Sequence, residues 1–139
     1  MADLSSLIRL HKHELDAKRQ ILSRLYFAHA ELERERRALE QAFEREKENL
    51  EAMGEVHFTF AGYAERVRQQ REQIEAKEKL LEQEIVKAKD SLMETFSEMK
   101  KYEMTQEERL RLEEEARRLK ESKTMDEIGL ETFRRGEKS

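Results

Sequence analysis

Residues 4–53 read LSSLIRLHKHELDAKRQILSRLYFAHAELERERRALEQAFEREKENLEAM, and their pattern predicts the fold. Apolar side chains recur in this stretch at alternating spacings of three and four, which is the heptad repeat of a coiled coil. Ten of the fifteen seam positions are apolar. These positions are Leu4, Ile8, His11, Leu15, Lys18, Leu22, Leu25, His29, Leu32, Arg36, Leu39, Phe43, Glu46, Leu50 and Met53. The repeat predicts a single helix about 75 Å long.

A second seam follows, and ten of its thirteen positions are apolar. They are Phe60, Ala64, Val67, Arg71, Ile74, Glu78, Leu81, Ile85, Ala88, Leu92, Thr95, Met99 and Tyr102. Between the seams, residues 54–62 hold two glycines among aromatic and β-branched residues, which form helices less readily than Leu or Glu. We interpret this segment as the bend of an antiparallel hairpin with arms of similar length. One continuous rod that tolerates both glycines is the alternative.

The composition excludes most other folds. The 139 residues include no Cys, Pro or Trp and only four Gly, and 43% of them are charged. Without cysteine there is no disulfide scaffold and no zinc ribbon, and sheets need more turn residues than this chain has. The fold class predicted is therefore all-α, a long antiparallel two-helix coiled-coil hairpin with a short C-terminal helical tail.

Two capping boxes suggest further boundaries. TQEE at 105–108 and TMDE at 124–127 each place Thr at the N-cap and Glu three residues later. A third segment would start at Thr105, or the second helix would continue with a shift in its apolar register. We predict that residues 1–121 form the hairpin, with its bend near 54–62. Residues 122–139 are predicted to be a hinge at Ser122 and Lys123 followed by a short helix or a flexible tail.

Charged residues in the two seams predict the register of the hairpin. With the bend centred midway between its two glycines, Glu46 faces Arg71, and Arg36 lies one turn diagonally from Glu78. Such pairs fix the register at a cost in stability. The same register places His29 against Ala88, and Lys18 against Met99 without a partner. A hairpin of only two helices is marginal, so we expect a partner or self-association to stabilise it.

Charge and hydropathy limit the classes of partner. The formal net charge is −4 and is spread evenly along the chain, whereas nucleic-acid binding needs clustered basic residues. No apolar stretch approaches the ~18–20 residues that span a bilayer, and no signal peptide is visible. We expect no nucleic-acid partner, no integral membrane insertion and a cytoplasmic location, which the absence of Cys fits.

No motif for catalysis stands out. There is no phosphate-binding glycine loop and no His-Glu-x-x-His, and a thiol nucleophile is impossible without Cys. Of the four histidines, His11 and His13 point apart on a helix, while His11 and His29 occupy seam positions, where packing is the first interpretation and a ligand or pH switch the second. We therefore expect no catalytic, cofactor-binding or metal-binding residue, and no enzymatic activity.

Two groups of residues are candidates for binding a partner. The first lies at the bend, where local packing that closes the bend is the other interpretation: Phe58, Phe60 and Tyr63. The second forms a short amphipathic helix, which would either fold back on the hairpin or dock in a groove of a partner: Met125, Ile128, Leu130 and Phe133.

Several segments together resemble the bacterial flagellar FliJ-like export proteins. They are LSSLIRLHK at 4–12, ELDAKR at 14–19, FTFAGYA at 58–64, FSEMKKYE at 96–103 and MDEI at 125–128. Their order and spacing along the whole chain carry the resemblance, because single coiled-coil segments look alike.

The resemblance implies a cytoplasmic, non-enzymatic coiled coil similar to the rotor stalk of rotary ATPases. Its partners would be the hexameric export ATPase, the membrane export gate protein and the export chaperones. It would act as a general escort factor at the inner face of the cell membrane. Two other readings of the residues stay open, a prefoldin-like helical-hairpin holdase or adaptor, and a structural coiled-coil dimer.

Overall fold

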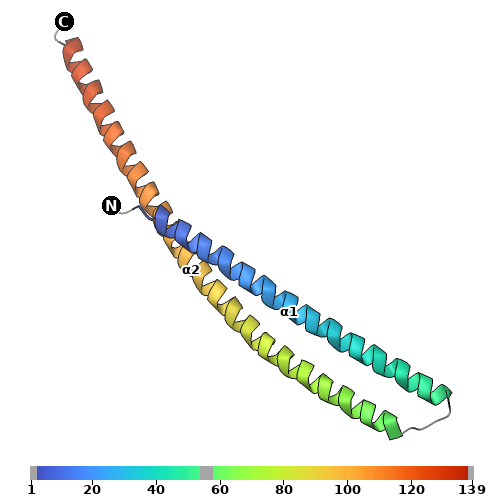
Figure 1. Ribbon diagram of the computed structural model, residues 1–139. Coiled ribbons are helices and arrows are strands. Elements are labelled where there is room, and N and C mark those ends of the chain that lie inside the picture. Colours follow the sequence, from blue (N-terminus) through green and yellow to red (C-terminus); the bar gives the residue numbers. More distant parts are fainter. Residues whose placement is uncertain (1–2, 54–57, 138–139) are drawn as a thin grey trace. The chain divides into compact units, whose positions relative to one another are not determined.

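The computed structural model describes residues 3–53 and 58–137. Two helices make up these ranges, α1 over Ser5–Ala52 and α2 over Phe58–Glu137 (Figure 1). They pack against each other as an antiparallel pair, and no strand occurs in the two described ranges. The predicted all-α hairpin is confirmed.

The chain divides into two compact units, each containing part of both helices. One unit is His13–Thr95, and the other combines Met1–Lys12 with Phe96–Ser139. In the first unit, α1 and α2 meet along the predicted seams, because residues spaced three and four apart lie on one face of a helix. Leu15, Val67 and Ile74 are only 3–4% exposed, and Ile85 is 8% exposed.

The predicted seam positions are correct for almost all of their length. Every one of them from Leu4 to Phe43, and every one from Phe60 to Tyr102, is buried or half-buried. The exceptions are Glu46 and Met53 near the end of α1, which are exposed. Hydrophobic burial on these two matching faces is the main force that holds the helices together.

The bend is shorter than predicted. α1 ends at Ala52 and α2 begins at Phe58, so residues 59–62 are helical, while residues 54–57 lie outside the described part of the chain. Gly62 is accommodated inside α2, where an added Cβ would have no neighbour within 4 Å. The centre of the bend therefore lies three to four residues earlier than predicted. In an antiparallel pair, that displacement moves each residue's partner by about one heptad.

The predicted pairing of Glu46 with Arg71 is wrong for this reason. Arg71 Nε lies 3.6 Å from Glu40 Oε1, and Glu46 is exposed. A shift of one heptad brings an equivalent face of α1 opposite α2, so the apolar seam survives it. Arg71 therefore meets Glu40 in place of Glu46.

Lys18 is likewise not left without a partner opposite Met99. Its Nζ donates a hydrogen bond to the Ser91 carbonyl oxygen at 3.2 Å and another to the Thr95 hydroxyl. Thr95 is 3% exposed, so this contact brings the ammonium group into the seam between the helices. The bonds to two oxygens compensate for part of the water that the charge loses.

In the second unit, a side chain of α2 caps the start of α1. Gln106 Oε1 accepts a hydrogen bond from the Leu4 N–H at 3.0 Å, and Gln106 Nε2 donates to the Ser5 hydroxyl at 3.0 Å. Asp3 Oδ1 accepts bonds from the Ser5 hydroxyl and the Ser5 N–H, and these bonds lower the pKa of Asp3. Free N–H groups at a helix start need such acceptors. Gln106 thus fastens the first turn of α1 to α2.

Neither predicted capping box begins a helix. The Thr105 hydroxyl donates to the Lys101 carbonyl at 2.8 Å, and the Thr124 hydroxyl donates to the Lys120 carbonyl at 2.9 Å. Threonine makes this bond to the preceding turn when a helix runs through it. α2 continues to Glu137 without a break at 122–123, so the predicted hinge and separate short helix are replaced by one continuous helix.

The Gln106 cap gives a direct prediction. Gln106→Ala should leave the Leu4 N–H without its acceptor and lower the free energy of unfolding by about 1 kcal/mol. Hydrogen exchange of the first turn of α1 should become faster. Thr105→Ala is the matched control, because Thr105 bonds only within its own helix. Equal exchange rates in the two variants would contradict the cap.

Candidate interaction surfaces

The aromatic residues predicted at the bend pack within the hairpin. The Phe43 ring of α1 lies 5.8 Å from the Phe60 ring and 6.2 Å from the Tyr63 ring, both nearly parallel to it. Phe60 and Tyr63 are half-buried. This is the local packing that the sequence left open as an alternative, and stacked rings at these separations attract one another. The side chain of Phe58 lies outside the described residues.

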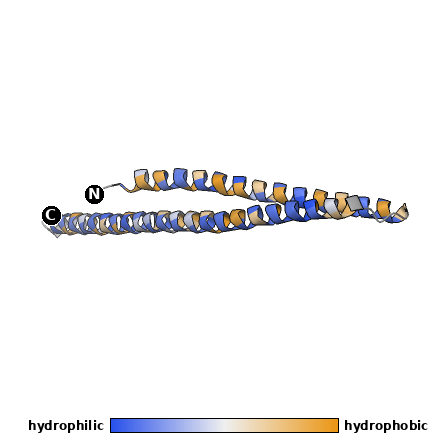
Figure 2. Cartoon of the chain, turned by 60° about the horizontal axis from the view of Figure 1, so that its bottom comes forward, coloured by the Kyte–Doolittle hydropathy of each residue, from blue (hydrophilic) through white to orange (hydrophobic). Residues whose placement is uncertain are grey.

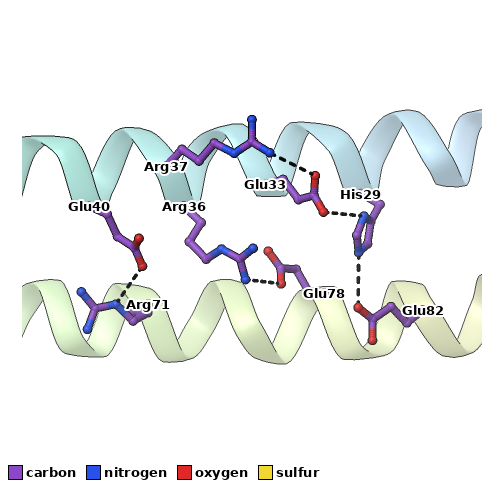
Figure 3. Close-up of polar contacts among 8 residues, drawn as sticks. All are labelled: His29, Glu33, Arg36, Arg37, Glu40, Arg71, Glu78 and Glu82. Carbon is purple, nitrogen blue, oxygen red and sulfur yellow. Dashed lines mark hydrogen bonds and ion pairs between the residues drawn. The ribbon is translucent and has the colours of Figure 1, made fainter.

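Charged residues occupy the middle of the hairpin seam (Figure 3). Arg36 Nη1 donates to Glu78 Oε2 at 3.0 Å, across the two helices. The predicted proximity of these two residues is confirmed, and they are in direct contact. Glu78 is only 8% exposed, and its second carboxylate oxygen is buried without a hydrogen-bond partner. Arg36 therefore supplies most of the interaction that offsets the loss of hydration of this carboxylate.

Two further polar contacts flank this pair. His29 lies between two carboxylates, with Nε2 3.4 Å from Glu82 Oε1 and Nδ1 3.7 Å from Glu33 Oε1 (Figure 3). It therefore faces Glu82 and not Ala88. On the other side, Arg71 Nε faces Glu40 but is buried without a hydrogen bond. The His29–Glu82 and Arg71–Glu40 contacts cross between α1 and α2, so together with the Arg36–Glu78 pair they distinguish this register from its neighbours one heptad away.

A shallow apolar groove runs beside the seam in the same unit. Its volume is about 920 Å³, and the Phe27 and Leu80 side chains in its wall are 63% and 62% exposed. Its apolar lining comes from both helices: Phe27, Ala28, Leu32, Ala38, Leu80 and Leu81. A groove of this kind is where an additional helix could pack.

In the other unit, the last part of α2 lies alone. Figure 1 shows this part, in orange and red, without another helix beside it. The four tail candidates are between 55% and 69% exposed: Met125, Ile128, Leu130 and Phe133. The described chain does not cover them, so the predicted fold-back of the tail is not observed. Exposed apolar side chains of this number on one helix are typical of an interaction site.

The seam histidines make contacts that fit a structural role. His11 is 8% exposed, with Nδ1 2.8 Å from the Leu7 carbonyl oxygen and Nε2 3.3 Å from Glu98 Oε2. Its ring lies 5.2 Å from the Tyr102 ring. Among the described residues, no group of three or more metal-ligating side chains is close enough to hold an ion.

Hydropathy alternates along both helices (Figure 2). Short hydrophobic segments are separated by hydrophilic ones, as two amphipathic helices require. No helix in the described ranges has an apolar stretch long enough to cross a bilayer.

Comparison of the chain with protein families, characterised proteins and solved structures finds no match.

Sequence reasoning missed one structural residue of the second unit, Gln106, whose partners lie about a hundred positions away. The Asp3–Ser5 start signal for α1 was present in the sequence, but no local pattern links it to α2.

Proposed function

We propose that this protein is a non-enzymatic stalk of the flagellar type III export apparatus, standing between the export ATPase ring and the membrane export gate. The proposal rests on the FliJ-like segments together with the helical hairpin. In it, the chain is peripheral at the inner face of the cell membrane and also escorts export chaperones. The chain acts mechanically and by binding its partners, and none of its side chains takes part in catalysis.

The main support for the proposal is the part of α2 that continues past the start of α1. α2 runs on from Gln106, where α1 starts, to Glu137, and this continuation exposes its apolar side chains. A stalk needs a rigid helical pair and, at one end, a helix surface that a ring can grip. Helix-in-groove binding uses apolar residues spaced along one helix, as this continuation supplies them.

The remaining surface suits contacts that form and break. Exposed ion pairs such as Arg68 with Glu65, and Arg111 with Glu108, lie within single helices. Solvent-exposed pairs contribute little energy, typically ~0.2–1 kcal/mol each. Charges of both signs can therefore exchange partners at low cost as a ring changes conformation around the stalk.

Capture of the export ATPase tests the proposal. Immobilised full-length chain should retain the purified export ATPase. Replacing both Leu130 and Phe133 with Glu should reduce that capture at least about tenfold, because hot-spot residues carry most of the binding energy. Leu80→Glu is the matched control, since Leu80 is exposed to a similar degree but lies in the hairpin groove. Failure of the folded wild-type chain to retain the ATPase would refute the stalk.

The second candidate is a prefoldin-like holdase. Exposed apolar residues near helix ends favour it, namely Met53 at 70% and Phe133 at 65% exposure. A holdase would suppress aggregation of unrelated unfolded proteins without the ATPase. A stalk would leave such aggregation unchanged, so a light-scattering assay separates the two functions.

A further inference from the structure

The exposed end of α2 carries a third heptad pattern, which α1 does not cover. Positions spaced alternately by four and three form one row, here called the tail stripe: Leu112, Ala116, Leu119, Lys123, Asp126, Leu130 and Phe133. Its four large apolar members are 52–66% exposed. The row is offset by part of a turn from the continuation of the hairpin seam, whose last position is Tyr102, and α1 does not cover it.

A second row flanks the tail stripe on one side. It alternates in sign along the helix and is here called the flanking row: Glu113, Lys120, Glu127 and Arg134. In the described part of α2, neither these four residues nor Lys123 and Asp126 form an ion pair. Arginines on the other faces of the same segment are paired with glutamates of their own helix: Arg111, Arg117, Arg118 and Arg135. The charges in the stripe and in the flanking row are thus available for another chain.

We propose that the tail stripe pairs with the tail stripe of a second copy as an antiparallel coiled coil. The two-fold axis passes between residues 124 and 125. Lys123 then faces Asp126 of the second copy, Leu119 faces Leu130, and the small Ala116 faces the large Phe133. In an antiparallel coiled coil, the flanking row of one copy faces the flanking row of the other. Lys120 therefore meets Glu127, and Glu113 meets Arg134. The symmetry produces each contact twice.

Other alignments of two tails are unfavourable. A parallel pair brings Lys123 against Lys123 and Asp126 against Asp126. An antiparallel pair shifted by one heptad in one direction brings Lys120 against Lys120 of the second copy. A shift in the other direction brings Glu127 against Glu127 of the second copy. Like charges in such contacts repel one another, so the charge pattern selects one orientation and one register.

The interface is short. The tail stripe and the flanking row supply eleven residues of each chain, fewer than the ~20–30 a side that stable protein interfaces use. The dimer should therefore be reversible and concentration-dependent. It hides Leu130 and Phe133 but leaves Met125 and Ile128 exposed, because those two lie on the outer face of the tail. The inference stands on the pattern of the tail and does not rest on the proposed stalk function.

Sedimentation equilibrium of the full chain tests the dimer. From about 5 to 300 µM, the average mass of the wild type should rise from 16.7 kDa toward twice that value. Lys120→Glu alone, or Glu127→Lys alone, should weaken dimerisation about tenfold, since each places like charges together at two symmetric contacts. The double variant Lys120→Glu/Glu127→Lys should recover wild-type dimerisation. An equimolar mixture of the two single variants should recover it as a heterodimer.

Helix content by circular dichroism serves as the folding control, because both substituted positions are exposed on the surface of α2. A wild type that stays monomeric throughout this range would overturn the proposal. So would dimerisation that the single variants leave unchanged, because the contact would then lie elsewhere, for example in the apolar groove of the hairpin. A double variant as weak as the single ones would overturn the antiparallel register.

Discussion

Arg36→Leu should lower the free energy of unfolding by about 2–3 kcal/mol, whereas Glu78→Leu should change it by less than about 1 kcal/mol. The two residues form one ion pair, but their surroundings differ. The Glu78 side chain is 10% exposed and one of its oxygens already lacks a partner, while the Arg36 side chain is 36% exposed. Removing the arginine leaves a buried carboxylate without compensation. Removing the carboxylate leaves a guanidinium that can turn toward water.

Urea denaturation of the two single variants and of Arg36→Leu/Glu78→Leu measures this asymmetry. The double variant should be at least as stable as the wild type, because two leucines in the seam need no desolvation of charge. Equal losses in both single variants would mean that the pair is effectively solvated. A double variant less stable than the wild type would show that the ion pair is a net source of stability.

Ile74→Ala should cost about 2–3 kcal/mol, and Leu80→Ala less than about 0.5 kcal/mol. Both residues lie in α2, six positions apart, but Ile74 is 4% exposed in the seam and Leu80 is 62% exposed beside it. The first substitution leaves a cavity between the helices. The second removes a side chain that already faces solvent, and alanine also favours the helix.

The same urea denaturation series distinguishes the two sites. If Leu80→Ala destabilised the wild type as strongly as Ile74→Ala, the groove that contains Leu80 would be filled in solution. The assignment of the seam face of α2 would then need revision. Measuring both variants at several protein concentrations separates loss of the hairpin from loss of any association.

The seam faces could be predicted from the sequence, but the register could not. Spacings of three and four determine which side of a helix is apolar, whatever the position of its partner along the axis. Sliding α1 by seven residues therefore keeps the apolar faces together and changes only the charged pairs. The bend decides between these alternatives, and Phe58 and Gly62 belong to α2 and not to the bend.

Helix ends were the other point at which local patterns were insufficient. Thr105 and Thr124 matched capping boxes, yet a threonine hydroxyl also bonds to the preceding turn inside a helix. Which of the two occurs depends on whether the chain has a reason to break, and no glycine or proline supplies one between residues 63 and 128. The cap provided by Gln106 is a tertiary contact and has no local signature.

The candidate surfaces could be predicted to different degrees. Met125, Ile128, Leu130 and Phe133 were recognised as apolar residues of a tail helix, and their exposure agrees with a surface open to a partner. Phe60 and Tyr63 were recognised as a cluster, but their packing on Phe43 depends on the position of the bend. This ring packing is a property of the folded pair and not of either segment alone.

Mass photometry of the purified flagellar export ATPase, with and without this chain, tests the stalk most directly. Adding the full-length chain should shift the ATPase toward a hexamer that carries one copy of the chain. An ATPase whose mass distribution is unchanged by an excess of chain with full helix content would contradict it.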